Sequence, residues 1–278
     1  MPLIAMTREM GSLGKDVAAG LAQRHGRKVV YHEIIEPIAN KMRLRKSHVE
    51  RFLEGKSGLW ERLTTDRTSL SIFTADETFR FLQDGSTGVI RGWGAPHLLK
   101  DIPHVIRVRI CAPFALRVER MMERLGSDNR EAVESEIEMS EEAHSAITKR
   151  HFGIHWREPE HYDACLNTGR VSVDECIHEL EALMQAPQFQ ETHASMRAQS
   201  DLALAWGVRS ALRRDARTAQ ARFQVKCDDG VAFLSGMDDG PNAMDAALAV
   251  AHGVAGVREA RGQVRAHPLG PARLKVEG

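Results

Sequence analysis

The sequence predicts an α/β fold in which a parallel sheet is flanked by helices, followed by a smaller α+β module. Three observations lead to this prediction. Over residues 1–186, short apolar runs alternate with amphipathic stretches, which is the pattern of βαβ units. A glycine-bearing turn at residues 11–14 separates the first apolar run from the first amphipathic stretch. Beyond Ala186 the periodicity weakens, and a second pattern with its own hairpin signal begins near residue 200.

Strand and helix alternate through the first part of the chain. The apolar and alternating runs predict strands at residues 2–6, 28–31, 88–90, 104–111 and 164–167. Apolar residues at helical spacing predict helices at residues 16–25, 33–42, 115–125, 130–149 and 173–185, and a largely helical stretch from 43 to 84. The predicted domain spans residues 1–186.

The second part is expected to form a domain of its own at residues 200–268. Residues 187–199 have little apolar periodicity and are predicted to be a linker or a connecting helix, and residues 269–278 a tail. A helix is expected at 202–213, strands at 223–227 and 231–234, a second helix at 243–252, and a last strand near 264. The Asp229-Gly230 pair between the two alternating runs is a strong hairpin signal.

Charge and cysteine content exclude several classes of protein. Lys and Arg together number 38, as do Asp and Glu, so the formal net charge is +0. A protein that coats nucleic acid carries a basic excess, so we expect no nucleic-acid polymer as a partner. The four cysteines show no CxxC spacing, and we find no secretory leader and no run near the ~18 apolar residues of a membrane span. These features predict a cytoplasmic protein with reduced thiols.

The turn after the first predicted strand has the composition of a phosphate-binding loop. Gly11 and Gly14 flank Ser12-Leu13, and Lys15 opens the helix that follows. Glycines let backbone N–H groups turn toward a phosphate, and the start of a helix favours negative charge. The alternative is a tight glycine turn whose only purpose is to let a helix pack against a strand.

The loop departs from the full signature GxxxxGK[ST] at two positions. Gly14-Lys15 fits, but Glu9 stands in place of the first glycine and Asp16 in place of the metal-binding hydroxyl. A carboxylate beside phosphates is unfavourable unless it holds Mg²⁺, so Asp16 is the candidate metal ligand.

Five segments in the same order resemble the cytidylate-kinase-like family, and together they cover about residues 1–186. They are IAMTREMGSLGKDVAAGLAQRHG, YHEIIEPIANKM, GVIRGWGAPHLLKD, VRICAPFALRVERMMERLG and HFGIHWREPEHYDACLNTGRVSVDECIHEL. The resemblance implies a P-loop kinase-type fold that transfers the γ-phosphoryl group of ATP, with Mg²⁺, to CMP or a similar nucleoside monophosphate.

The resemblance also implies roles for individual residues. Because phosphoryl transfer depends on positioning and charge neutralisation, cations matter most. The implied catalytic residues are Lys15, Arg117 and Arg120. The implied ATP-binding residues are Arg8, Gly11, Ser12, Leu13, Gly14, Lys15 and Asp16. The implied acceptor-binding residues are His32, Arg91, Trp93, Lys149 and Arg150. For the pair Arg117 and Arg120, one helical turn apart, a solvated helix face is the alternative.

Several departures from the family pattern leave a second interpretation open. The departing residues are Glu9, Asp16, His32, Trp93 and His144, of which the last stands where a lid arginine is usual. The alternative is a catalytically weakened nucleotide-binding regulatory protein. A third possibility is a kinase of another small acceptor.

Residues 200–266 resemble a BON domain. The segments that carry the resemblance are WGVRSALRRDART, FQVKCDDGVAFLSG and GVAGVREARGQV. It implies a phospholipid or protein partner and no catalytic role. A basic helix face could meet anionic headgroups, and its members are Arg209, Arg213, Arg214 and Arg217. A solvated charged face is the alternative interpretation.

Overall fold

The structure is a computed structural model and describes residues 2–31, 33–47, 49, 67–83, 85–92, 94–237 and 242–265. The chain divides into two compact units, residues 1–198 and 199–278, which are described separately. No helix in these residues is long and apolar enough to span a bilayer.

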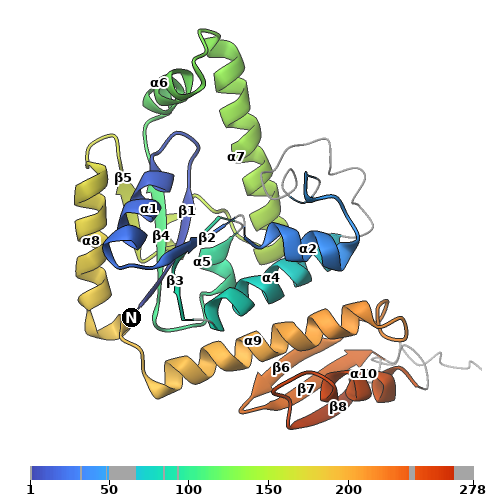
Figure 1. Cartoon of the computed structure of the whole chain (residues 1–278). Helices are drawn as coiled ribbons and strands as arrows, with labels where there is room; N and C mark the ends of the chain where they lie inside the picture. The colour runs from blue at the N-terminus through green and yellow to red at the C-terminus, as the bar shows by residue number, and fades with distance from the viewer. Residues whose placement is uncertain are drawn as a thin grey trace, which may run out of the picture. The chain divides into compact units, whose positions relative to one another are not determined.

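A parallel five-stranded sheet forms the centre of the first unit (Figure 1). Its strands are β1 (Leu3–Arg8), β2 (Lys28–Val30), β3 (Thr87–Arg91), β4 (Val105–Cys111) and β5 (Ala164–Asn167), in the order β2-β3-β1-β4-β5. Consecutive strands are parallel and joined through helices, as the alternating pattern predicts. The predicted P-loop kinase-type sheet flanked by helices is confirmed.

Helices cover both faces of this sheet. On one face α1 (Gly14–Arg24) and α8 (Val173–Gln185) pack side by side over a core that includes Ile4, Val108 and Leu180. On the other face α5 (Ala95–Leu98) packs against β1 and β4, and α4 (Arg67–Gln83) packs against β3 and α2 (Ile35–Met42). Of the predicted helical stretch 43–84, residues 50–66 lie outside the described part of the chain.

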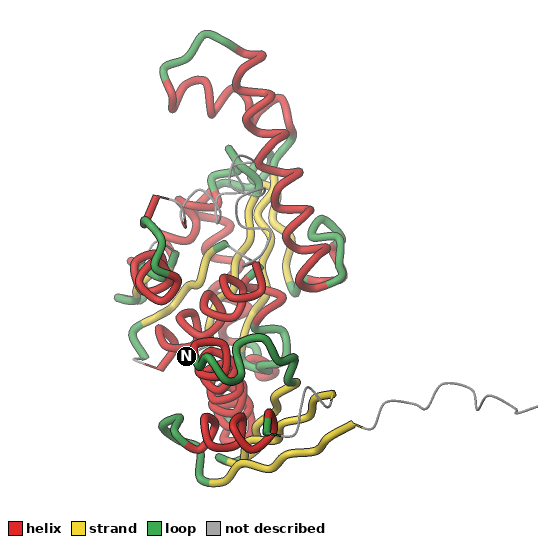
Figure 2. The backbone as a smooth tube through the Cα atoms, turned by 90° about the vertical axis from the view of Figure 1, so that its right-hand side faces the viewer, coloured by secondary structure: helices red, strands yellow, loops and turns green. Residues whose placement is uncertain are grey.

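Two helices form a hairpin that extends past the carboxyl ends of the strands (Figures 1 and 2). They are α6 (Phe114–Leu125) and α7 (Arg130–Phe152), joined through the left-handed Gly126. Asn129 caps α7 by accepting a hydrogen bond from the Ala132 N–H at 3.0 Å. A small apolar cluster, including Val118 and Ile137, holds the two helices together.

The second unit has a three-stranded sheet in the order β6-β7-β8. Strands β6 (Gln224–Asp228) and β7 (Val231–Met237) are antiparallel, and β8 (Glu259–Arg265) pairs parallel with β7. Asp229 and Gly230 both have positive φ, 45° and 76°, as a type I′ hairpin turn requires. The predicted hairpin and the small α+β module are confirmed. Helices α9 (His193–Arg214) and α10 (Ala243–His252) supply Val208 and Ala247 to its core.

The segment 187–199, predicted as a linker or connecting helix, is largely ordered into helical structure. It contains the 3₁₀ helix η3 (Pro187–Phe189) and the beginning of α9. The Ser195 hydroxyl near the start of α9 lies 2.9 Å from Nδ1 of His104, which precedes β4. The division between the two units falls inside α9, after Ala198.

Strand β4, which lies between β1 and β5, contains a position where truncation should destabilise the first unit. Ile106 is completely buried there, so Ile106→Ala is expected to lower the free energy of unfolding by about 2–5 kcal/mol through lost burial and a residual cavity. Leu125 is 51% exposed, and Leu125→Ala is the control, with a change within about 0.5 kcal/mol. Urea denaturation measures both. Equal losses in the two variants would contradict this assignment of the core.

Candidate functional site

A tight loop joins β1 to α1, and its glycines are required by close approaches. Gly11 has φ +79°, and a Cβ there would lie 2.6 Å from the carbonyl oxygen of Arg117. A Cβ at Gly14 would lie 2.7 Å from Cβ of Arg8. Between them Leu13 adopts a left-handed conformation with φ 58°, which is uncommon for a residue other than glycine. The loop is therefore wrapped closely against α6 and the end of β1.

The loop offers hydrogen-bond donors and positive charge that could bind an anion. The Ser12 side chain is completely buried, and its Oγ has no hydrogen-bond partner among the described residues. The N–H groups at the start of α1 carry partial positive charge, and among them that of Asp16 donates to the Leu13 carbonyl oxygen at 2.9 Å. Lys15 and Asp16 are both exposed at the start of α1. The predicted ATP-binding residues of the loop therefore lie together around one helix start.

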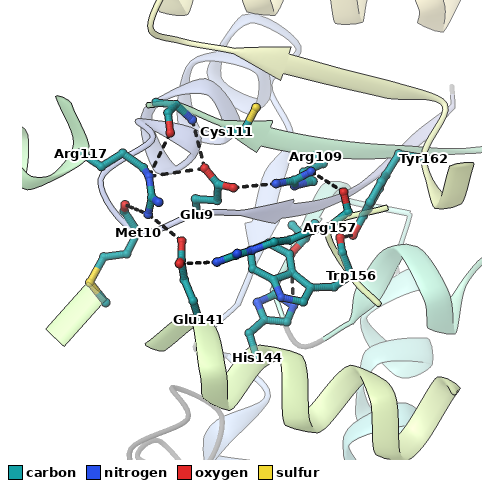
Figure 3. A network of polar contacts seen from close by, with 12 residues as sticks. Glu9, Met10, Arg109, Cys111, Arg117, Glu141, His144, Trp156, Arg157 and Tyr162 are labelled. Atoms are coloured by element: carbon teal, nitrogen blue, oxygen red, sulfur yellow. Dashed lines mark hydrogen bonds and ion pairs between the residues drawn. The ribbon is translucent and has the colours of Figure 1, made fainter. Parts of the chain in front are cut away.

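Glu9, which replaces the first glycine of the signature, is turned into the protein (Figure 3). Its carboxylate accepts a hydrogen bond from Arg109 at 2.6 Å and another from the Ala112 N–H at 3.1 Å. It also lies 3.4 Å from Nε of Arg117. The expectation of a carboxylate beside the phosphates is corrected, because Glu9 joins the end of β1 to the end of β4 and to α6.

The guanidinium of Arg117 is buried in the same network (Figure 3). It donates to the carbonyl oxygens of Ala112 and Met10, and it forms an ion pair with Glu141 of α7 at 2.8 Å. Glu141 also pairs with Arg157, which follows α7. We call the five residues Glu9, Arg109, Arg117, Glu141 and Arg157 the Glu9 network. Arg117 thus contacts protein groups from three segments: the end of β1, the end of β4 and α7.

Arg120, the second predicted catalytic arginine, bonds to the loop that follows β5. Its guanidinium donates to the Thr168 hydroxyl at 3.0 Å and to the Thr168 carbonyl oxygen at 2.9 Å. The same hydroxyl donates to the Ser12 carbonyl oxygen at 2.8 Å. Arg120 and Thr168 therefore brace the glycine loop from outside. The solvated face that was the alternative for Arg117 and Arg120 is wrong.

His144 stands on α7 at the expected lid position but lies against a buried indole (Figure 3). Its ring stacks on Trp156, with centroids 4.2 Å apart and planes 6° apart. Its Nε2 is 3.4 Å from the Thr7 hydroxyl. Burial, aided by nearby cationic groups, lowers the pKa of His144 to about 3, so the ring is neutral at pH 7. Lys149 and Arg150, two of the predicted acceptor-binding residues, are exposed near the end of α7.

A pocket opens beside the carboxyl ends of β2 and β3. It encloses about 350 Å³, open solvent at its mouth included. Arg91 lines it together with Tyr31 and Gly92, and apolar side chains such as Ile34 and Leu98 complete the described wall. The Arg91 guanidinium lies over the Tyr31 ring, 4.1 Å from its centroid. Two further predicted acceptor-binding residues, His32 and Trp93, lie outside the described residues.

The sequence analysis did not identify several side chains that hold the residues of this site in place. Arg109, Glu141 and Tyr31 were not singled out, although each holds a predicted site residue in place. One signal was available for Arg109: in the strand VIRVRIC it lies between two buried apolar residues, Val108 and Ile110. The pairing of Arg117 with Glu141 joins residues 24 positions apart on two helices, which no local pattern reveals.

A family model for the cytidylate kinase-like family matches residues 3–170, which is more than half of the chain. The chain belongs to the cytidylate kinase-like family. The match covers the glycine loop, the Glu9 network and the pocket. A search of curated proteins gives no match.

Solved structures extend the likeness in fold. An uncharacterized protein from Eubacterium ventriosum is 20% identical, with a TM-score of 0.52, over 67% of this chain and 99% of that one. Shikimate kinase from Bacteroides thetaiotaomicron is 13% identical with a TM-score of 0.40, over 66% and 99% of the two chains. Shikimate kinase from Acinetobacter baumannii, in complex with shikimate, has the same identity and TM-score over 68% and 96%. At 20% identity, the likeness to the Eubacterium ventriosum protein is one of fold alone.

The Glu9 network predicts the cost of removing its central carboxylate. In Glu9→Gln the buried charges of Arg109 and Arg117 lose a shared counter-ion, so the free energy of unfolding should fall by about 3–5 kcal/mol. Glu134→Gln removes the exposed ion pair with Arg130 and should cost less than about 1 kcal/mol. Both are measured by urea denaturation at pH 7. Similar small losses in both variants would show that the network contributes little.

Buried neutral histidines predict how stability depends on pH. Burial lowers the pKa of His97 from 6.5 to about 4, and that of His144 to about 3. Between pH 6.5 and these values the unfolded chain binds protons that the folded chain does not, so stability should fall as pH falls through this window.

The measurement is the free energy of unfolding between pH 7 and pH 4. His97→Phe and His144→Phe should each flatten the decline, whereas the exposed His178→Asn is the control and should leave it unchanged. A decline of the same steepness in all three variants would assign the pH dependence to other groups.

Proposed function

We propose that the first unit binds a nucleoside triphosphate at the glycine loop and transfers its terminal phosphoryl group to a small acceptor, of which CMP is the first to test. The fold and the family suggest kinase activity on a nucleotide or another small molecule. The proposal rests on the loop of residues 11–14 at the start of α1, where Lys15 is exposed and the buried Ser12 hydroxyl has no hydrogen-bond partner among the described residues. A cytoplasmic location stays a prediction.

The chemistry proposed is an in-line displacement at phosphorus. An acceptor oxygen forms a bond to the γ-phosphorus, the bond between that phosphorus and the β,γ-bridging oxygen breaks, and the diphosphate leaves. The acceptor's proton passes to solvent or to a phosphate oxygen. Backbone N–H groups of the loop and the Lys15 ammonium neutralise the phosphate charge, and this neutralisation is the main contribution of such a site.

Asp16 fits a magnesium role in one respect. Its exposed carboxylate is on the first turn of α1, beside Lys15, and carboxylate oxygens are ligands that Mg²⁺ accepts. Bound there, the ion would supply further neutralisation of phosphate charge. Asp16 would hold it, while Lys15 and the loop would orient the phosphates.

The other predicted catalytic residues then have positioning roles. Arg117 contacts the carbonyl oxygen of Met10 and leaves no room for a side chain at Gly11. Arg120 braces Ser12 through Thr168. Both arginines fix the loop in shape before any phosphate arrives, which lowers the ordering cost of binding.

One observation favours the weakened, regulatory alternative. The lid position is occupied by His144, which is neutral and stacked on Trp156, so it offers no cation to a transferring phosphoryl group. Loss of such a cation can cost about 10³-fold in rate. If the first unit is an active kinase, we propose that Lys149 or Arg150 near the end of α7 supplies that charge.

Removing the loop cation tests the proposal. Wild-type protein is incubated with ATP, Mg²⁺ and each nucleoside monophosphate while release of ADP is followed. Lys15→Met should lower kcat/KM by about 10²–10³-fold, because the phosphates lose their charged partner. Lys28→Met, at the exposed start of β2, is the matched control and should retain wild-type turnover.

Three outcomes separate the readings. Turnover that depends on Lys15 supports the kinase. Thermal stabilisation by ATP without turnover on any acceptor supports the regulatory alternative. Neither turnover nor stabilisation would overturn nucleotide binding at this loop.

For the second unit we infer a BON-like role in contacting a phospholipid surface or a protein, a role suggested by sequence resemblance alone. The basic helix face expected there is only partly available: Arg209 and Arg213 donate to backbone carbonyl oxygens, and Arg217 pairs with Asp215. Flotation of the full chain with anionic and neutral vesicles tests lipid contact. If neither wild type nor Arg214→Gln floats with anionic vesicles, lipid contact is excluded and a protein partner remains as the proposal.

A further inference from the structure

Arg8 and Arg91 lie at the carboxyl ends of two neighbouring strands and on the same face of the sheet. Strand β3 pairs in parallel with β1, and Arg91 is in register with Met6. Register partners share a face, as do residues two apart on one strand, so the side chains of Met6, Arg8 and Arg91 project the same way. That is the face covered by α1, whose Gly14 closely approaches the Arg8 side chain.

Both guanidinium groups have one specific contact: Nη1 of Arg8 donates to the Glu9 carbonyl oxygen at 3.4 Å, and Arg91 contacts Tyr31. The Arg91 guanidinium lies over the Tyr31 ring, which in turn occupies the space where a Cβ on Gly92 would be. That missing Cβ would come within 2.8 Å of the ring, and Gly92 has φ +87°, so glycine is needed at this position. The Gly92 N–H donates to the Met6 carbonyl oxygen at 2.9 Å, which ties the turn to β1.

Neither guanidinium has a counter-ion within the described part of the chain. Arg91 is 8% exposed, and Nε of both Arg8 and Arg91 is buried without a hydrogen-bond partner there. The charged groups that face them are Asp16 and Glu33, which act at longer range than an ion pair, and Arg124 near Arg8. Burial and the charge of Arg91 together lower the pKa of Arg8 to about 10.

This arrangement contrasts with the nearby Glu9 network. There, three arginines share two buried carboxylates, as buried charges normally require. Arg8 is half-buried and Arg91 is buried, both are on one face, and no acid of the described residues forms an ion pair with either. Such a pair is costly in the free protein, and an anion that accepts from both guanidinium groups would remove that cost.

We propose that Arg8 and Arg91 together bind one phosphate group of a ligand, between the glycine loop and the pocket beside β3. This inference rests on the proposed function and names the residues that recognise the anion. Arg8 supports the start of α1, and Arg91 lines the pocket. The phosphate is therefore either the terminal group of the triphosphate donor or the phosphate of the acceptor.

The chemistry favours phosphate over a simple carboxylate. Phosphate presents several oxygens and up to two negative charges, so it can accept forked hydrogen bonds from two guanidinium groups at once. Arg91 supplies its cation from the end of β3 itself, in the lining of the pocket.

Binding measurements on the full chain test the proposal without requiring turnover. Calorimetric titrations use pyrophosphate, ATP and CMP as separate probes. Arg8→Met and Arg91→Met keep much of the side-chain length and remove the charge, and each should weaken binding of the relevant probe by about tenfold or more. Arg130→Met, an exposed arginine of α7, is the matched control and should bind every probe as wild type does.

The probes identify the source of the phosphate. Loss of affinity for ATP and pyrophosphate assigns the pair to the donor, and loss for CMP alone assigns it to the acceptor. Melting temperatures in the absence of ligand give a second readout. Relief of repulsion should leave Arg8→Met as stable as wild type or more stable, whereas added pyrophosphate or CMP should stabilise wild type only.

The outcomes distinguish this inference from the proposed function. Binding of phosphate probes that depends on Arg8 and Arg91, without any turnover, supports the inference while the kinase proposal fails. Turnover and binding that are unchanged in both methionine variants would overturn the inference and leave the kinase proposal standing. A variant that unfolds is replaced by Arg91→Lys, which keeps one charge but not the fork and should still lose affinity.

Discussion

The carboxylate of Glu9 is the interaction on which the site depends. It lies where β1 ends and bonds to groups from β4 and α6, about 100 residues further along the chain, so these elements meet at one buried charge. Glu141 likewise pairs with two arginines, Arg117 and Arg157, and these ion pairs attach α7 to the same network. The glycine loop takes its course between these anchors, because Arg117 bonds to its first residues and fills the space beside Gly11.

The three residues Glu9, Asp16 and His144, which depart from the expected pattern, have different structural consequences. Glu9 is not a carboxylate left beside the phosphates, since its oxygens are already occupied by Arg109, Arg117 and a backbone N–H. Asp16, by contrast, is exposed and free to meet a cation at the start of α1. His144 stands where the resemblance implies a lid arginine, and its ring is neutral and stacked on Trp156. One departure is structural, one is compatible with metal binding, and one weakens the case for catalysis.

Much of the fold was predictable because its signals are local. Alternation with period 2 located strand 105–111, helical spacing located α1 and α8, and the Asp229-Gly230 pair located the hairpin of the second unit. The cluster of loop residues was predictable for the same reason, since they are consecutive. What could not be predicted was the direction of charged side chains. Arg117 and Arg120 were expected to face phosphate, but their partners Glu141 and Thr168 come from segments that only the tertiary fold brings near.

The stacking of His144 on Trp156 has a practical consequence for following motion in solution. Trp156 is 1% exposed, and its indole N–H donates to the Ser145 hydroxyl of α7 at 2.9 Å, so the ring is attached to that helix from two adjacent residues. Any displacement of α7 must change the polarity around this indole or break its stacking. Trp156 is one of the four tryptophans of the chain, so once the other three are replaced by phenylalanine its emission would register hairpin movement without an added dye.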